Sequence, residues 1–245
     1  MIKIMKILAF ECSTATASVA VGDNGKIIGE SSMEASRRHS EQLLPMADEL
    51  LASLGLTLAD IGALACSVGP GSFTGVRIGA ATVKGLAFGS SRSCVGTSSL
   101  TSLAYCHSNS EDGTIICPVI GCRRGNVYNA LYRVCGGEIT RLCDDRMISC
   151  TGLAEELISR GEQVIICGDE VPAVTALCPV DIVCTKNGDP LPSASGVALL
   201  ADKLLRERNA SGTPCENEYT DLTLSPDYFR PCQAERERLG IEDLQ

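Results

Sequence analysis

The feature that most constrains the fold is the order of apolar segments in the first hundred residues. Three short apolar runs at 5–12, 18–22 and 26–33 precede an amphipathic helical pattern, after which strand-like and helix-like segments alternate. Asp23-Asn24-Gly25 carries the turn chemistry of a hairpin between the second and third runs. A three-stranded antiparallel meander that continues into parallel strands with crossover helices predicts a mixed sheet flanked by helices.

The second half of the chain repeats this order after a polar break at 107–113, which is the expected boundary between two lobes. The expected elements are strands at 115–122, 126–135 and 138–141, a helix at 151–160, and strands at 163–167 and 180–184. Two halves that both open with three strands suggest an internal duplication. This layout is typical of the RNase H-like plan of the actin and hexokinase superfamily, a likeness of fold that specifies no activity.

The predicted fold class is therefore α/β, with two duplicated RNase H-like lobes, each a mixed sheet that opens with three strands and is flanked by helices. The first lobe is expected to span 1–107 and the second 113–245. A helix predicted at 195–208 either stays with the second lobe or packs back on the first. A charged tail from about residue 233 is expected to be solvated.

A glycine-rich turn, GPGSFTG, joins a predicted strand at 61–68 to a predicted helix at 73–88. Backbone N–H groups at such a place can meet an anion. In the other interpretation Gly69 and Gly71 only supply positive φ, and glycines within the helix only let another helix approach closely. The turn does not match the P-loop, because no Gly-Lys-Ser/Thr follows its glycines. It does not match the dinucleotide-binding fingerprint either, because three residues separate Gly71 from Gly75 where that fingerprint has two.

Composition excludes several classes of function. A net charge of −9 is poorly suited to neutralising nucleic-acid phosphates directly. The 14 cysteines include no CxxC pair, and the two histidines, His39 and His107, lie far apart, which argues against a zinc site. No segment reaches membrane-spanning length, and Glu11 ends the N-terminal apolar run too early for a signal peptide. We expect a soluble, cytoplasmic protein with reduced cysteines, no metal, no cofactor and no membrane contact.

Four segments carry a specific resemblance. In chain order they are KILAFECSTATASVAV, RRHSEQLLPM, GPGSFTGVRIGAATVKGLA and PDYFRPCQAERE. Together they resemble the TsaB (YeaZ) family of glycoprotease-like proteins, which act in the synthesis of threonylcarbamoyladenosine in tRNA. The resemblance is close over the first hundred residues and rests on layout and the tail motif beyond them. It implies a non-catalytic subunit that is similar in fold to TsaD, the transferase that modifies the adenosine beside the anticodon.

The resemblance also implies a lost active site. TsaD holds a metal with paired histidines, and this chain has no such pair. Active members of the wider superfamily place an Asp at the end of the first strand to hold the metal of a nucleotide, whereas this chain has Glu11 there. Glu11 is then an ordinary strand-end acid or, together with Gly69, Gly71 and Ser72, the remnant of a nucleotide site.

The partners that the resemblance implies are TsaD and TsaE, with tRNA reached only through the complex. The contact with TsaD is predicted through the helices at 40–54 and 73–88. Its expected residues are Leu43, Ala47, Leu50, Leu54, Gly75, Gly79, Ala80 and Val83. Without TsaD the same surface would support a homodimer. The alternative function is a small ATPase or kinase of the actin-like superfamily, with Glu11 on a magnesium ion and the 69–75 turn near phosphate.

Overall fold

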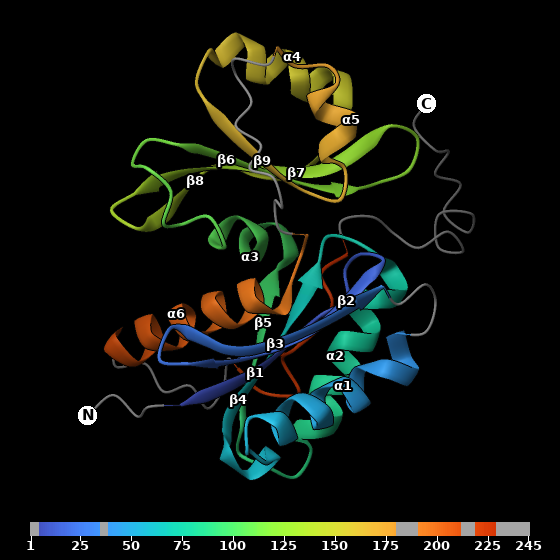
Figure 1. Ribbon diagram of the computed structural model, residues 1–245, viewed down its shortest axis with the longest axis vertical. Helices are drawn as coiled ribbons and strands as arrows, with labels where there is room; N and C mark the ends of the chain where they lie inside the picture. Colours follow the sequence, from blue (N-terminus) through green and yellow to red (C-terminus); the bar gives the residue numbers. More distant parts are fainter. Residues whose placement is uncertain (1–4, 35–38, 180–190, 212–218, 229–245) are drawn as a thin grey trace.

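The computed structural model describes residues 5–34, 39–179, 191–211 and 219–228, which form two stacked lobes (Figure 1). The first lobe is built on a five-stranded sheet in the order β3-β2-β1-β4-β5. Its strands are β1 (Lys6–Glu11), β2 (Thr16–Asp23), β3 (Lys26–Glu34), β4 (Ile61–Gly69) and β5 (Ser93–Ser98). The first three strands run antiparallel and the last two run parallel to β1, as the sequence predicts.

The second lobe repeats this order with one strand fewer, β8-β7-β6-β9. Its strands are β6 (Ile115–Gly121), β7 (Asn126–Cys135), β8 (Glu138–Ser149) and β9 (Val164–Gly168). Again three antiparallel strands come first, and β9 then runs parallel to β6. Strand β8 extends well beyond the predicted end at Arg141, because its polar residues face solvent while its backbone stays paired with β7. The predicted strand at 180–184 lies outside the described residues.

Helices cover the sheets in layers (Figure 1). They are α1 (His39–Ser53), α2 (Phe73–Ala87), α3 (Ser99–Tyr105), α4 (Cys150–Arg160), α5 (Val171–Thr175) and α6 (Ala194–Ser211). Helices α1 and α2 lie on the outer face of the first sheet, α6 and α3 lie between the two sheets, and α4 and α5 cover the far side of the second sheet. The five-residue helix α5 was not predicted, because it is too short to show a helical period.

Serine side chains fix where three of these helices begin. Ser72, Ser98 and Ser149 precede α2, α3 and α4, and each hydroxyl accepts a hydrogen bond from the backbone N–H three residues later. Such caps satisfy one of the N–H groups that a helix start leaves without a partner, and replacing one by alanine costs about 1 kcal/mol. The caps place the two strand-to-helix turns of the first lobe at defined residues.

Two segments that follow the second lobe in sequence pack on the first. Helix α6 contributes Ala194, Val197 and Ala198 to an apolar layer with Ile7 and Ala9 of β1. The segment 219–228 also returns to the first sheet: Cys94 N donates to Tyr219 O (2.9 Å), Asp227 N donates to Val68 O (2.7 Å), and Leu224 is buried in the core. The charged tail expected from residue 233 lies outside the described residues.

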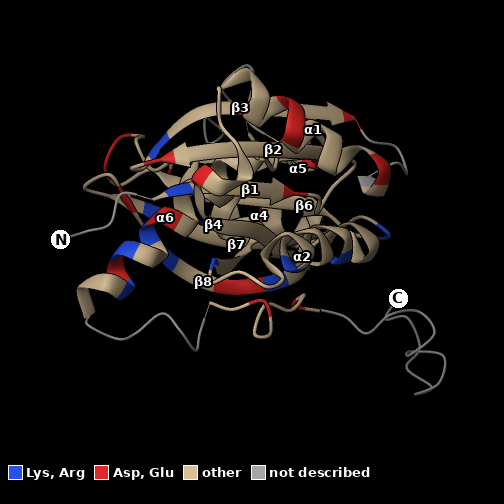
Figure 2. Cartoon of the chain, turned by 90° about the horizontal axis from the view of Figure 1, so that it is seen from below, with Lys and Arg blue, Asp and Glu red and all other residues tan. Residues whose placement is uncertain are grey.

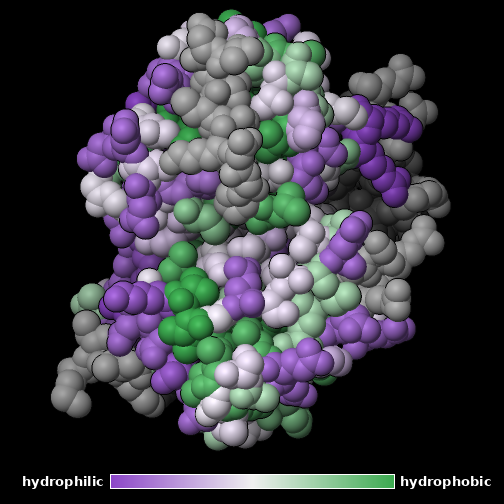
Figure 3. All heavy atoms as spheres, in the orientation of Figure 1, coloured by the Kyte–Doolittle hydropathy of each residue, from purple (hydrophilic) through white to green (hydrophobic). Residues whose placement is uncertain are grey.

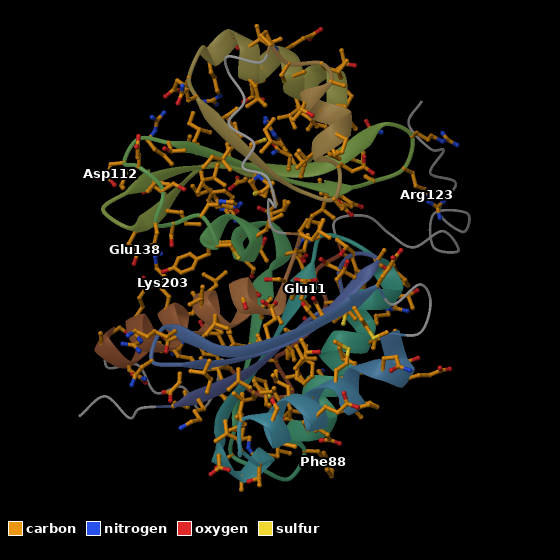
Figure 4. All side chains as sticks on the ribbon, viewed as in Figure 1. Glu11, Phe88, Asp112, Arg123, Glu138 and Lys203 are labelled. Carbon is orange, nitrogen blue, oxygen red and sulfur yellow. The ribbon has the colours of Figure 1, made fainter. Side chains whose placement is uncertain are left out.

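Polar contacts join the two lobes around α3. Ser98 Oγ donates to Asp145 Oδ2 (2.7 Å), and Thr101 Oγ1 and Tyr132 Oη are 2.8 Å apart. On the edge of this junction Lys203 of α6 forms an ion pair with Glu138 of β8, and the two side chains face each other in Figure 4. The lobes are thus tied by directed bonds as well as by packing.

Strand β3 is one of the two edge strands of the first sheet, and its side chains alternate between exposed and half-buried positions. On the side of the molecule shown in Figure 3, hydrophobic residues gather on the first lobe, and Ile28 of β3 is 40% exposed. Lys26, Glu30 and Glu34 interrupt this edge with charges, which discourages pairing with a second sheet. In the described ranges no helix is both long enough and apolar enough to cross a membrane.

Candidate functional site

The glycine-rich turn between β4 and α2 is held between two other parts of the chain. Gly69 and Gly71 both have positive φ, +123° and +149°. A Cβ atom on Gly71 would lie 2.4 Å from Ser13 O, and one on Gly69 would lie 2.6 Å from Asp227 O. A side chain at either position would clash with a backbone oxygen. The turn therefore needs glycine both for its positive φ angles and for its close approach to Ser13 and Asp227.

Of the predicted nucleotide residues, Glu11, Gly71 and Ser72 come together around the backbone of Ser13. Gly69 instead lies against Asp227 O. Ser13 N donates to Glu11 Oε1 (2.5 Å), and Ser13 O accepts from Ser72 N (2.7 Å). Ser72 Oγ in turn accepts from Gly75 N (3.2 Å). Two of the N–H groups at the start of α2 are therefore already bonded within the chain. An anion would have to compete with these internal partners.

Glu11 is fully buried at the end of β1, near the level where the two lobes meet (Figure 4). Its Oε1 also accepts from Ser67 Oγ (2.9 Å), whereas its Oε2 has no hydrogen-bond partner among the described residues. Burial raises the pKa of the Glu11 carboxyl above its ordinary value of 4.5, because the interior disfavours the charged form, and the bonds from Ser13 and Ser67 only partly oppose this. Burial in this place therefore disfavours the charged carboxylate that a cation would need.

Replacing Glu11 by glutamine is expected to flatten the dependence of stability on pH. Because the folded-state pKa is raised, the contribution of Glu11 to stability is fully present below pH 4.5 and is lost as the pH rises through the folded-state pKa. Urea unfolding of the wild type and of Glu11→Gln over this range measures the difference. The free-energy gap should move in favour of the variant as the pH rises. Exposed Glu49→Gln should not reproduce the change, and parallel curves for Glu11→Gln and the wild type would contradict the assignment.

The glycines of α2 let the helix approach its own sheet. A Cβ atom on Gly75 would lie 1.8 Å from Cys12 O, and one on Gly79 would lie 3.7 Å from the Cβ of Cys66. Gly75 and Gly79 are both buried. The sequence interpretation of these glycines as contacts for another helix thus misses their neighbour, which is the end of β1 for Gly75 and the face of β4 for Gly79.

The predicted partner-binding stripe also faces the core of the chain. Leu43, Ala47 and Leu50 of α1 are at most 8% exposed and pack in the core between α1, α2 and the first sheet. Leu54 is half-buried against the same core, and Ala80 and Val83 of α2 are buried in it. Because these side chains are already covered, a contact with a partner, which stays a prediction, must use other residues of the two helices.

A cluster at the start of α2 was not predicted from sequence. Phe73 and Tyr228 have ring centroids 4.9 Å apart, and Arg77 lies over the Phe73 ring at 3.9 Å from its centroid. The spacing of Phe73 and Arg77, one helical turn apart, is a local signal for this pair. Tyr228 could not be added from sequence, because it comes from the returning segment 219–228.

Thiol and metal chemistry find no support among the described residues. The described cysteines are free thiols, and burial raises the pKa of Cys94 to about 11 and the pKa of the Cys12, Cys66 and Cys117 thiols further above their usual range. Within the described ranges no group of three or more His, Cys, Asp or Glu side chains could hold a metal ion. The buried cysteines act as small apolar residues.

A sequence model of the TsaD family, described as tRNA N6-adenosine threonylcarbamoyltransferase, matches residues 29–188. The match covers more than half of the 245 residues and includes α1, the glycine-rich turn and α2. The chain belongs to this family.

Relatives within the family are TsaB proteins. The chain is 38% identical over 129 residues to the tRNA threonylcarbamoyladenosine biosynthesis protein TsaB of Escherichia coli, a match that spans 53% of this chain and only about half (55%) of that protein. It is 28% identical over 237 residues to TsaB of Bacillus subtilis, covering 94% of this chain and 96% of that one. The resemblance to the TsaB (YeaZ), glycoprotease-like group is thereby confirmed.

Solved structures agree with this grouping. An uncharacterized protein with similarity to peptidase YeaZ from Pseudomonas aeruginosa superposes with a TM-score of 0.73 at 27% identity. The superposition covers 93% of this chain and 100% of that one. The predicted α/β fold with two lobes, each a mixed sheet that opens with three strands, is confirmed by this similarity and by the observed strand order.

Proposed function

We propose that the chain is a non-catalytic subunit required for threonylcarbamoyl transfer to the adenosine beside the anticodon in tRNA. It acts in the cytoplasm, holds TsaD in a competent state and helps to recruit TsaE, and it reaches tRNA only through the complex. The names of its TsaB relatives support the pathway. The buried Glu11 and the internally bonded turn support a subunit that has no catalytic site of its own.

The observation that carries the proposal is an exposed surface on α1 and α2, which we call the outer helical face. It consists of the exposed residues Leu44, Asp48, Arg77, Ala81, Gly85 and Phe88. Phe88 is 84% exposed and projects from the end of α2 (Figure 4). An exposed aromatic ring next to small residues on a helix is typical of a surface that another helix covers.

The charges of this face are divided between the two helices (Figure 2). Helix α1 presents the exposed acids Glu41, Asp48 and Glu49, whereas the only charged residues of α2 are Arg77 and Lys84. A partner therefore needs a basic strip opposite α1 and an acidic strip opposite α2. A second copy of this chain carries both strips, which supports the homodimer as the state in the absence of TsaD.

Placing a charge at the centre of this face tests the proposal. Ala81→Glu should lower the affinity for TsaD at least about 100-fold, because the added carboxylate would be buried in the contact opposite the acidic strip expected of the partner. The fold should survive, since Ala81 is exposed. Co-purification with TsaD from the same organism, and a tRNA modification assay with TsaD and TsaE, provide the measurements.

The matched control is Ala210→Glu, an exposed alanine near the end of α6, a helix on the opposite face of the first sheet. It should bind TsaD and support modification as the wild type does. Wild-type binding and modification by a folded Ala81→Glu protein would contradict the proposed face.

The ATPase or kinase alternative makes a different prediction, namely that the isolated chain binds ATP with magnesium and turns it over. The gathering of Glu11, Gly71 and Ser72 around Ser13 favours it, whereas the complete burial of Glu11 counts against it. Calorimetry with ATP and magnesium, together with a turnover assay on the isolated chain, separates the two functions. Turnover by the isolated chain would support an enzyme over a scaffold.

A further inference from the structure

Arg77 is held in one orientation on the outer helical face by two aromatic rings. Its guanidinium carbon lies 3.9 Å from the ring centroid of Phe73 and 5.2 Å from that of Tyr228. Its Nε donates to Tyr228 Oη at 2.5 Å. An arginine that is stacked on a ring and bonded through Nε has already lost most of its rotamer freedom, so binding through its other nitrogens costs less entropy.

The far end of this side chain is unused by the described part of the protein. Arg77 is exposed, and no Asp or Glu of the described residues forms an ion pair with it. Its bond to Tyr228 uses Nε, and its two terminal nitrogens make no hydrogen bond within the described ranges. A fixed guanidinium with two free nitrogens matches the two oxygens of a carboxylate.

We propose that Arg77, fixed by Phe73 and Tyr228, is the docking point for a carboxylate of an Asp or Glu side chain on a helix of TsaD. This inference rests on the proposed function and adds to it the chemistry of the recognised group. The arginine would select a partner helix with an acid at this position, while Ala81 and Gly85, further along α2, allow that helix to lie close.

A protein carboxylate fits this place better than a phosphate of a nucleotide or of tRNA. The N–H groups of Ser72 and Gly75, which would complete a phosphate site at the start of α2, already bond to Ser13 O and Ser72 Oγ. The net charge of −9 opposes the approach of a polyanion. Beyond Arg77 the exposed residues in and directly after α2 are Ala81, Gly85 and Phe88, with Lys84 half-buried beside them, and this mostly small and apolar surface suits a packed helix.

The test titrates TsaD from the same organism into the full chain and three variants. Arg77→Gln should weaken the Kd about 10- to 100-fold, as expected for the loss of a charge-assisted bidentate pair. Arg77→Lys, which keeps the charge but loses the planar fork, should recover only part of this loss. Tyr228→Phe keeps the ring but removes the acceptor for Nε, so it should weaken binding about two- to fivefold by freeing the arginine.

Arg123→Gln is the matched control, because Arg123 is an exposed arginine on the second lobe (Figure 4). It should leave the Kd unchanged. The salt dependence of the Kd should become shallower in Arg77→Gln and stay unchanged in Arg123→Gln, which separates a lost ion pair from a general change of shape.

The outcomes distinguish this inference from the proposed function. If the wild type does not bind TsaD, the proposed function fails and the docking point fails with it. If the wild type binds and Arg77→Gln binds equally well, the docking point alone is overturned. If ATP or tRNA binds the isolated wild type but not Arg77→Gln, while the Kd for TsaD is unchanged, Arg77 serves a phosphate and the inference is again overturned.

Discussion

Gly75→Ala is expected to destabilise the protein by about 3 kcal/mol or more, or to prevent folding, although alanine is a better helix former than glycine. The added Cβ would lie 1.8 Å from the carbonyl oxygen of Cys12, and real contacts of this kind need more than 3 Å. Neither partner can yield easily, because Cys12 directly follows the buried end of β1 and α2 packs on β4. Thermal and urea unfolding followed by circular dichroism measure the loss.

Gly85→Ala in the same helix is the control for Gly75→Ala. Gly85 is exposed, and an added Cβ would meet no atom within 4 Å. The substitution should therefore stabilise the protein by about 0.5 to 1 kcal/mol through helix propensity alone. Equal effects of the two substitutions would show that α2 does not approach β1 as described.

Leu43→Ala is expected to lower the free energy of unfolding by about 2 to 5 kcal/mol, because it opens a cavity in a closely packed core. Leu43 is 1% exposed, and it packs with Leu8 and Phe10 of β1 in the same cluster. At a temperature where the variant is folded, its affinity for TsaD should stay close to that of the wild type. Urea unfolding and a TsaD titration on the same preparation provide both readings.

For the neighbouring Leu44 we expect the reverse, a small effect on stability and a larger one on binding. Leu44 is 44% exposed on the outer helical face, so Leu44→Ala should change stability by less than about 1 kcal/mol while weakening TsaD binding about threefold or more. If Leu43→Ala instead weakens binding without a loss of stability, the stripe of α1 faces a partner and the core assignment is wrong.

This pair also shows what sequence can and cannot decide about the site. The period of Leu43, Ala47, Leu50 and Leu54 correctly predicts an amphipathic helix, but a stripe that faces a sheet and one that faces another protein have the same period. The exposed side of α2 shows no apolar stripe in the sequence, because Ala81 and Gly85 are small and Phe88 is the one large apolar residue among them. Which side is free depends on how the helix sits on the sheet, and the sequence pattern does not contain that information.

The fold itself was largely predictable because its evidence is local. Alternating apolar runs and turn residues such as Asn24-Gly25 predict the order of the elements and many of their bounds, with β8 and α5 as exceptions. The contacts that shape the glycine-rich turn join residues far apart in sequence, as Ser72 N does with Ser13 O. No periodicity reports such a bond, so the turn could be located from sequence while its internal bonding could not.

The return of α6 and the segment 219–228 to the first sheet affects the order in which a growing chain can fold. A ribosome makes the strands β1 to β5 first, yet the layer that covers Ile7, Ala9 and Ala20 arrives only with residues 194–205. Leu224, which fills the core beside β5, emerges later still. The N-terminal lobe is thus begun first and completed last, and during synthesis one face of its sheet stays open to water or to a chaperone.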